Sequence, residues 1–208
     1  MRILLINQYA GSPTLGMEYR PHWLAREWQQ AGHEVLIVAA DWTHLRREQP
    51  TATNGRAMVE GVPFRLVRVP RHDGNGPRRF ANILAFAAGL WAQVGQLGRW
   101  NPDVVIASST HPFDVRAAHR VARSVGAPLI HEVHDLWPLT PRLLGGLSPR
   151  HPMIRWMQVE EDFACRNAHA VVSILPATQD YLVGRGLKRE KWFHVSNGVP
   201  PDALVDPV

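Results

Sequence analysis

The stretch RILLINQYAGSPTLGMEYRPHWLAREWQQAGHEVLIVAAD, residues 2–41, decides the fold of this chain. It begins with a short apolar run and continues through a loop that carries glycines and a proline. Apolar residues at helical spacing follow, and then a second apolar run. This order of strand, loop, helix and strand is typical of the first unit of an open parallel sheet. Ligands of such sheets bind outside the carboxyl ends of the strands, so we first expect function in the loop from Asn7 to Arg20.

The rest of the chain repeats this alternation. We expect strands at 2–7, 35–39, 57–60, 64–69, 104–107, 129–133, 170–174 and 192–195. We expect helices at 17–31, 80–99, 114–125, 154–167 and 177–183, with connections at 41–54 and 135–149. The pattern predicts an α/β fold, in which a Rossmann-like, mostly parallel sheet carries helices on both faces.

The composition limits the class of protein. With 208 residues the chain forms one large domain or, less readily, two small ones. A lone Cys165 excludes an intramolecular disulfide and fits a reducing compartment. No uninterrupted apolar stretch approaches the roughly 18 residues of a spanning helix, and the first residues do not form a signal-peptide pattern. These features predict a cytoplasmic protein.

The net charge of +5 comes from arginine, because the chain has only two lysines. Arginine suits bidentate contact with phosphate or carboxylate groups. Nucleic acid is not an expected partner, since no basic run is interleaved with stacking aromatic residues. Arg71, Arg78 and Arg79 precede the apolar helix expected at 80–99. Either that helix covers the sheet, or it and these arginines contact an anionic membrane surface.

The first loop carries residues suited to an anionic ligand. It has neither a Walker motif nor the GxGxxG fingerprint of dinucleotide enzymes, which argues against a reductase in which Asp41 would bind a ribose. The amide of Gly16 is expected near a helix N-terminus, where unpaired amides attract a diphosphate. The positive charge of Arg20 at this positive end of the helix dipole is electrostatically unfavourable unless an anionic group pairs with it.

Polar residues also follow two later strands, in SSTHP at 108–112 and in HEVHDLWP at 131–138. Both segments lie at expected carboxyl ends of parallel strands, so we expect them beside the first loop in one crevice. In an extended strand Glu132 and His134 share a face, whereas His131 and His134 do not. We therefore expect a hydrogen-bonded pair and no metal site. A nucleophilic triad is not expected, because no serine lies in a GxSxG elbow.

At these positions the sequence resembles the N-terminal half of family 4 glycosyltransferases. The resemblance covers nearly the whole chain and is carried by MRILLINQYAG, LGMEYRPHWLAREWQQAGHEVLIVAA, VHDLWPLTPRLLGG, SPRHP, AVVSILP and VSNGV. More narrowly, GMEYRP together with HDLWP resembles bacterial enzymes that extend lipid-linked sugars for surface polysaccharides. The wider family usually has a Gly-Gly pair in the first loop, whereas this chain has Gly16-Met17.

The resemblance implies the two-domain GT-B architecture and a retaining transfer, usually without a metal or other cofactor. Residues 1–196 would form the N-terminal acceptor-binding domain and 197–208 the start of the interdomain linker. The donor-binding C-terminal domain, with its paired glutamates, is absent from the chain. The expected partners are a nucleotide-sugar donor and a glycan acceptor linked to polyprenyl diphosphate, with the enzyme in the cytoplasm or peripheral on the inner face of the membrane.

Site roles follow from the same resemblance and from the predicted strand ends. The donor diphosphate is expected to face Gly16, Met17 and Arg20, and the catalytic candidates are His134, Asp135 and His111. Acceptor contacts are expected from Glu18, Tyr19, Glu132 and Trp137. The isolated domain is expected to be inactive. The alternatives are another Rossmann-type nucleotide-binding enzyme, such as a reductase, and a stand-alone, non-catalytic acceptor-binding module.

Overall fold

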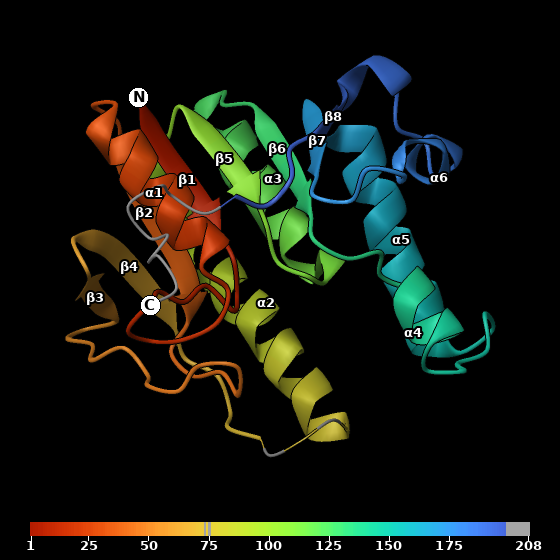
Figure 1. Cartoon of the computed structure of the whole chain (residues 1–208), viewed down its shortest axis with the longest axis horizontal. Coiled ribbons are helices and arrows are strands. Elements are labelled where there is room, and N and C mark those ends of the chain that lie inside the picture. Colours follow the sequence, from red (N-terminus) through yellow and green to blue (C-terminus); the bar gives the residue numbers. More distant parts are fainter. Residues whose placement is uncertain (73, 75, 199–208) are drawn as a thin grey trace, which may run out of the picture.

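The computed structural model describes residues 1–72, 74 and 76–198 (Figure 1). One eight-stranded sheet runs through this part of the chain in the order β3-β4-β2-β1-β5-β6-β7-β8. Its strands are β1 (Arg2–Ile6), β2 (Glu34–Ala40), β3 (Arg56–Val59), β4 (Val62–Val67), β5 (Val104–Ala107), β6 (Leu129–Val133), β7 (Ala170–Ser173) and β8 (Trp192–His194). Every pairing is parallel except that of the edge strand β3 with β4. The expected α/β fold with a mostly parallel sheet is confirmed.

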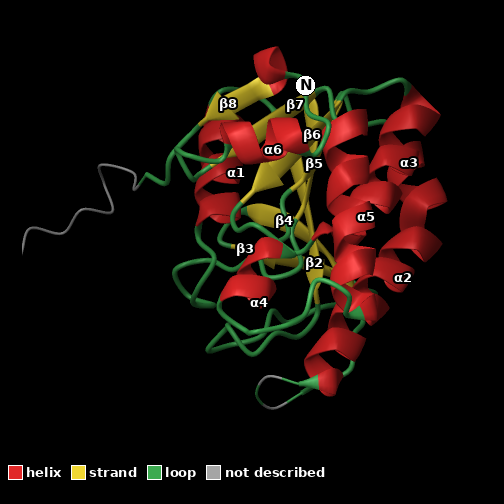
Figure 2. Cartoon of the chain, turned by 90° about the vertical axis from the view of Figure 1, so that its right-hand side faces the viewer, coloured by secondary structure: helices red, strands yellow, loops and turns green. Residues whose placement is uncertain are grey.

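Helices cover both faces of the sheet. They are α1 (Arg20–Gln30), α2 (Pro77–Arg99), α3 (Val115–Val125), α4 (Leu139–Leu143), α5 (Pro152–Asn167) and α6 (Gln179–Gly184), with 3-10 turns η1 (Pro112–Asp114) and η2 (Arg189–Lys191). Figure 2 shows α2, α3 and α5 on one face and α1 on the other. Helix α6 lies on the side of α5, because Leu182 of α6 packs with Cys165 of α5. Because both faces are covered, the central strands need apolar residues at successive positions.

Alternate residues of β1 therefore belong to two different cores. Leu4 and Ile6 pack with residues of α2 and α3, whereas Ile3 and Leu5 pack with Ala25 of α1. The apolar run that begins the chain is thus buried on both sides. Burial of this kind stabilises a domain by roughly 25 cal/mol per Å² of apolar surface, and it fixes the register of β1 between β2 and β5.

Two helices differ from the expectation. The helix expected at 17–31 begins only at Arg20, because Gly16, Met17 and Glu18 have φ angles of 85°, 47° and 50°. Residues in the left-handed region cannot continue a right-handed helix. The short helix α4 lies inside the segment 135–149 that we expected to be a connection. Of the linker expected at 197–208, residues 199–208 lie outside the described part of the chain.

Helix α2 differs from the other helices in its length and apolar character. Within the described residues it is the one helix that is long and apolar enough to cross a membrane by length and composition, and 33% of that stretch is buried in the domain. Phe86, Leu90 and Leu97 of α2 lie in the core beneath the sheet. Trp91 of α2 is 47% exposed. The burial of its inner face assigns α2 to the packed fold.

Candidate active site

A buried carboxylate joins the start of α1 to the carboxyl ends of β5 and β6. Glu132, near the end of β6, is 4% exposed. Its Oε2 accepts a hydrogen bond from Ser108 Oγ at 2.6 Å and lies 3.1 Å from Nε2 of His134. Its Oε1 accepts from Nε and Nη2 of Arg20, at 3.1 and 2.9 Å. One carboxylate therefore connects three segments that are far apart in the sequence.

The charge of Glu132 is stabilised by these partners. Burial alone would raise the pKa of Glu132, but the hydrogen bond and charge of His134, the charge of Arg20 and the hydrogen bond of Ser108 together lower it to about 2. A carboxylate that accepts several hydrogen bonds and faces cationic groups stays ionised despite burial. Glu132 is therefore an anion at neutral pH and serves as a fixed anchor for Arg20 and His134.

Arg20 binds the end of the described chain as well as Glu132. Its Nη1 donates to the carbonyl oxygen of Ser196 at 2.8 Å, and its Nη2 donates to that of Val195 at 3.2 Å. The anionic partner that Arg20 requires at a helix N-terminus is thus Glu132. Arg20 holds the first turn of α1, the end of β6 and the segment after β8 together.

The first loop has an unusual backbone at residues 16–18. Three consecutive residues adopt left-handed φ angles, and two of them, Met17 and Glu18, are not glycine. Such residues cost of order 1–3 kcal/mol each unless their surroundings enforce the conformation. Met17 occupies the position at which the wider family usually has a second glycine, so its side chain is placed on a backbone that suits glycine better.

The structure places the Gly16 amide away from the expected ligand position. Its N–H donates to the carbonyl oxygen of Ser12 at 2.8 Å, and Gly16 is buried beneath Arg47. In contrast, the amides of residues 17–20 donate to no other residue within the described chain. The amides suited to an anion are therefore those that follow Gly16, at the uncapped N-terminus of α1.

Residues that the sequence analysis did not single out hold this loop in place. Thr14 donates two hydrogen bonds to Glu60 Oε1, from its backbone N at 3.0 Å and from its Oγ1 at 2.7 Å. Arg46 is 5% exposed and donates from Nε to the carbonyl oxygen of Ala10 at 2.9 Å. Gly11 lies directly beneath the turn, where an added Cβ would stand 2.1 Å from the Met17 carbonyl oxygen. The contacts of Thr14 and Arg46 join residues 46 and 36 positions apart, so no local sequence motif marks them.

An open cleft of about 370 Å³ lies between the first loop and the end of β6. Residues that line it include four of the expected site residues, Glu18, Tyr19, Arg20 and His134. Thr110, Trp23, Ile174, Asn197 and Gly198 complete the lining. Burial raises the pKa of the Glu18 carboxyl against the opposing charge of His134. The cleft thus combines a carboxyl group, an imidazole and the free amides at the start of α1.

Other expected site residues lie outside this cleft. Asp135 binds its own loop, since its Oδ1 accepts from Leu136 N at 2.8 Å and from Thr140 Oγ1 at 2.6 Å. Its Oδ2 accepts from the indole Nε1 of Trp137 at 3.1 Å. Trp137 faces a neighbouring apolar cleft instead. Asp135 is therefore placed to hold the Trp137 loop rather than to transfer a proton.

His111 is in the core and not on the rim where we expected it. It is 1% exposed, its Nε2 is hydrogen-bonded to Gln8 Oε1, and its Nδ1 accepts from Phe113 N at 3.4 Å. Burial lowers its pKa to about 3, so the ring is neutral at pH 7. Gln8 in turn donates to Asn82 of α2 at 2.6 Å. His111 therefore positions the end of β1 against α2.

The geometry around His134 also bears on nucleophilic catalysis. Ser108 Oγ lies 2.9 Å from Nε2 of His134, and the same nitrogen faces Glu132. A catalytic triad requires serine and carboxylate on opposite ring nitrogens, so this cluster lacks that geometry. Within the described part of the chain, no group of three His, Cys, Asp or Glu residues is arranged to hold a metal ion. The arrangement suits binding and orientation of a ligand by His134 Nδ1, which has no hydrogen-bond partner among the described residues.

Comparison with known proteins identifies the family. Residues 16–198 match the family described as glycosyl transferase 4-like domain. This chain belongs to that family. The match covers the end of the first loop from residue 16, the end of β6 and the segment after β8, so the cleft belongs to the matched region. Asp41, the residue considered for a dinucleotide enzyme, accepts a hydrogen bond from Val69 N at 3.0 Å and does not face the cleft.

Solved GT-B glycosyltransferases share the fold of this glycosyl transferase 4-like domain. Sucrose-phosphate synthase from Thermosynechococcus elongatus has a TM-score of 0.65 at 11% identity, over 95% of this chain and 48% of that chain. HepE from Anabaena, solved with UDP-glucose, has a TM-score of 0.53 at 16% identity, and the match covers 96% of this chain and 44% of HepE. The lipopolysaccharide outer core galactosyltransferase WaaB has a TM-score of 0.54 at 15% identity, and the match covers 100% of this chain and 48% of WaaB. The domain spans about half the length of these chains, and no curated protein sequence matches it significantly.

Proposed function

We propose that this domain is the acceptor-binding half of a retaining glycosyltransferase. The enzyme would transfer a sugar from a nucleotide-sugar donor to a glycan linked to polyprenyl diphosphate, in the synthesis of a cell-surface polysaccharide. A donor domain following residue 196 would complete the cleft. The observation that carries the proposal is the position of His134, held by Glu132 at the open cleft beside the start of α1.

The donor side of the proposal rests on the start of α1. This helix has no side-chain cap and no acidic residue in its first turn, and the amides of residues 17–20 are unpaired within the described chain. Such a helix end favours a diphosphate through its amides and its dipole. HepE, which shares the fold, was solved with UDP-glucose, which supports a nucleotide-sugar donor. Arg20 would act by holding this turn, since Glu132 already occupies its guanidinium.

The acceptor side rests on His134 and Glu18. With Nε2 of His134 engaged by Glu132, the ring is fixed in orientation and Nδ1 is left for a hydroxyl group in the cleft. Glu18 lines the same cleft. These groups would orient the acceptor hydroxyl and assist its loss of a proton. WaaB, a lipopolysaccharide galactosyltransferase of the same fold, supports an acceptor on a cell-surface glycan.

The test is a transfer assay with a full-length protein that contains this domain. We expect His134→Ala to lower kcat by about 10²–10⁴-fold. The His134 side chain is 7% exposed and contacts the buried Glu132, so the variant also loses stability, and kcat is compared well below the midpoint of its thermal unfolding. His33→Ala is the matched control, since His33 lies far from the cleft at the N-terminus and should leave kcat unchanged. Unchanged transfer by the His134 variant would refute the proposal.

The domain by itself should lack transferase activity and bind nucleotide sugars weakly. Half of the proposed donor site would be missing, so the remaining amides would contact only the diphosphate. Isothermal titration calorimetry of the 208-residue chain with UDP-glucose measures this directly. Tight binding or catalytic turnover by the isolated chain would contradict the division of roles between two domains.

A further inference from the structure

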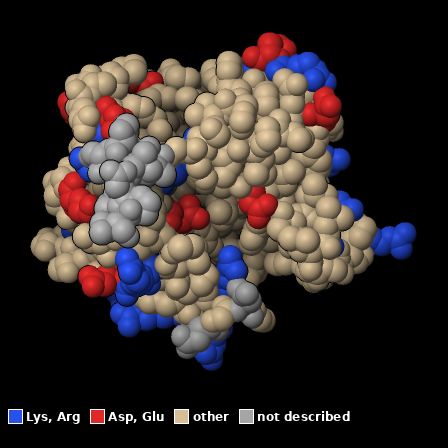
Figure 3. Space-filling view, viewed as in Figure 1, with Lys and Arg blue, Asp and Glu red and all other residues tan. Residues whose placement is uncertain are grey.

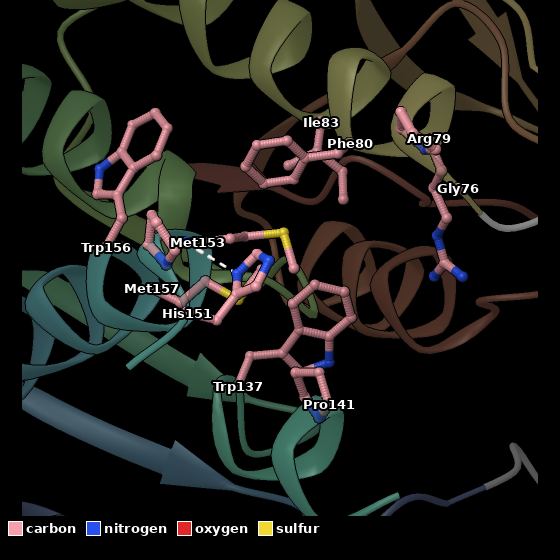
Figure 4. A pocket seen from close by; sticks show the side chains of 12 residues that line it. Gly76, Arg79, Phe80, Ile83, Trp137, Pro141, His151, Met153, Trp156 and Met157 are labelled. Carbon is pink, nitrogen blue, oxygen red and sulfur yellow. Dashed lines mark hydrogen bonds between the residues drawn. The ribbon is translucent and has the colours of Figure 1, made fainter. Parts of the chain in front are cut away.

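A second cleft, of about 660 Å³, lies beside the Trp137 loop. Figure 4 shows side chains from the start of α2 facing Trp137 and the first turns of α5 across this space. Its volume lies in the range of small-molecule sites, about 300–1,000 Å³. The site described above does not include this cleft. No described residue that lines the cleft is hydrogen-bonded to Glu132, Ser108 or His134.

The lining of the cleft is almost entirely apolar. It includes Phe80, Ile83, Trp137, Met153, Trp156 and Met157. Ile83 and Met157 are each 1% exposed and form the floor, whereas Trp156 is 45% exposed. A concave apolar surface of this kind that stays open to solvent marks a site for an apolar ligand or partner.

The margins of the cleft differ from its interior. Arg79 and His151 line its edge, and the exposed Arg78 and Arg150 directly precede them in the sequence. Figure 3 shows Lys and Arg side chains gathered along the lower edge of the molecule, where the N-terminal end of α2 lies in Figure 1. An apolar interior with a cationic margin is complementary to a molecule that joins an apolar chain to an anionic group.

Exposed apolar side chains continue from the cleft onto the surface. Helix α4 supplies Pro141 to the wall and carries Leu143, which is 69% exposed, next to Leu144, which is 85% exposed. On α5, Val159 is 52% exposed. A surface of this composition is suited to contact with the interface of a membrane, from which a lipid chain would enter.

Trp137 and Thr110 relate the two clefts to each other. Trp137 lines the apolar cleft and also a narrow gap that it shares with Thr110 and Asp135. Thr110 in turn lines the cleft that contains His134. The hydrogen bond from Trp137 Nε1 to Asp135 Oδ2, at 3.1 Å, fixes the indole in the wall between them. A ligand that spans both clefts would pass this residue.

We propose that the apolar cleft binds the part of the acceptor's isoprenoid chain nearest to its diphosphate. The diphosphate would lie at the margin formed by Arg78, Arg79 and His151, and the glycan would extend past Trp137 toward His134. This inference rests on the proposed function, because it assigns the lipid of the same acceptor to a place on the domain. In this proposal Asp135 is a positioning residue, because it accepts the hydrogen bond that orients the Trp137 indole.

Calorimetry with the 208-residue chain tests the site, with farnesyl diphosphate, farnesol and inorganic diphosphate as probes. Met153→Asp places a charge in the wall of the cleft, and an acidic residue in the first turn of α5 is compatible with that helix. We expect this variant to bind farnesyl diphosphate at least 10-fold more weakly than the unchanged chain. Met153→Leu should retain binding within 2-fold, which separates a lost site from a lost fold.

The matched control is Met58→Asp, since Met58 is an exposed methionine of β3 remote from this cleft. It should leave the affinity for farnesyl diphosphate within 2-fold. Inorganic diphosphate should bind at least 10-fold more weakly than farnesyl diphosphate, and farnesol should also bind more weakly. Equal affinity for the two diphosphates, equal binding by Met153→Asp, or no binding by the unchanged chain would each overturn the proposal.

Two further outcomes separate this inference from the proposed function. Transfer to a polyprenyl-diphosphate acceptor that is undiminished by Met153→Asp in a full-length protein would overturn the lipid site and leave the proposed function intact. Transfer only to lipid-free acceptors would overturn both. A concentration-dependent dimer in light scattering that Met153→Asp abolishes would assign the cleft to a second copy of the chain and overturn the lipid site.

Discussion

The Nη2 atom of Arg20 lies 2.9 Å from Oε1 of Glu132, a residue 112 positions further along the chain. The side chains are 11% and 5% exposed, so this ion pair is buried. Arg20 also binds the carbonyl oxygens of Ser196 and Val195, where the predicted linker to a donor domain begins. The pair therefore joins the proposed donor side, the proposed acceptor side and the end of the domain.

Arg20→Met should destabilise the domain strongly, because it removes the guanidinium that pairs with the buried Glu132 carboxylate. Loss of one partner of a buried pair costs about 3–5 kcal/mol. Urea unfolding at pH 7 measures this change. The double variant Arg20→Met with Glu132→Gln should be less destabilised than the sum of the single variants predicts.

The exposed pair of Arg189 and Asp180 is the control for that experiment. Its nitrogen and oxygen lie 2.7 Å apart, but the side chains are 59% and 85% exposed. Arg189→Met should therefore lower the free energy of unfolding by less than about 1 kcal/mol. Additive effects of the Arg20 and Glu132 substitutions would show that the buried pair is not energetically coupled.

Met17→Gly should stabilise the domain by roughly 0.5 kcal/mol, because relief of the left-handed strain at φ 47° exceeds the added flexibility of the unfolded chain. Chemical denaturation of the two proteins measures the difference. Met58→Gly, at an exposed methionine in β3, should instead destabilise the domain, since glycine weakens a strand. A destabilised Met17→Gly variant would mean that the methionine side chain contributes more than its backbone costs.

Gly11→Ala should disrupt the first loop by steric overlap alone. The added Cβ would stand 2.1 Å from the carbonyl oxygen of Met17 and 2.3 Å from that of Gly16, so the loop must move. We expect a loss of about 1–3 kcal/mol and weaker nucleotide-sugar binding by a full-length protein. Gly184→Ala is the control, because an added Cβ there meets no atom within 4 Å. Equal stability of both variants would show that the loop adapts freely.

Glu161→Gln should change the pH dependence of stability. Burial raises the pKa of Glu161 to about 7, although hydrogen bonds from Tyr181 and Gln158 act against the increase. The folded state then binds more protons than the unfolded state between about pH 4.5 and 7, so this group lowers stability as the pH rises through that window.

The amide introduced by Glu161→Gln can still accept from Tyr181 Oη and Gln158 Nε2, which each lie 2.7 Å from the present carboxylate oxygen. The variant should therefore gain stability relative to the unchanged chain as the pH rises from 5 to 8, by at most on the order of 3 kcal/mol. Thermal unfolding across this range provides the measurement. A difference in stability that is constant with pH would contradict the raised pKa of Glu161.

The sequence by itself determined the alternation of strands and helices, the parallel sheet and the edge on which polar residues gather. Apolar periodicity is a local property, so β5 and β6 were predicted with their observed ends. The pairing of Glu132 with His134 also followed from local geometry, because alternate residues of a strand share a face. The family resemblance depended on short motifs that are contiguous in the sequence.

Only the tertiary structure decided which polar groups remain available for a ligand. The Gly16 amide, Asp135 and His111 carry the right chemistry, yet each is already bound. Ser12 binds the Gly16 amide and the Trp137 loop binds Asp135, whereas the fold brings Gln8 to His111 from 103 positions away. The apolar cleft beside Trp137 arises because α2 and α5 meet the Trp137 loop, three segments that are far apart in the sequence. Hydrogen-bond partners and cavities are properties of packing in three dimensions, and no spacing along the chain records them.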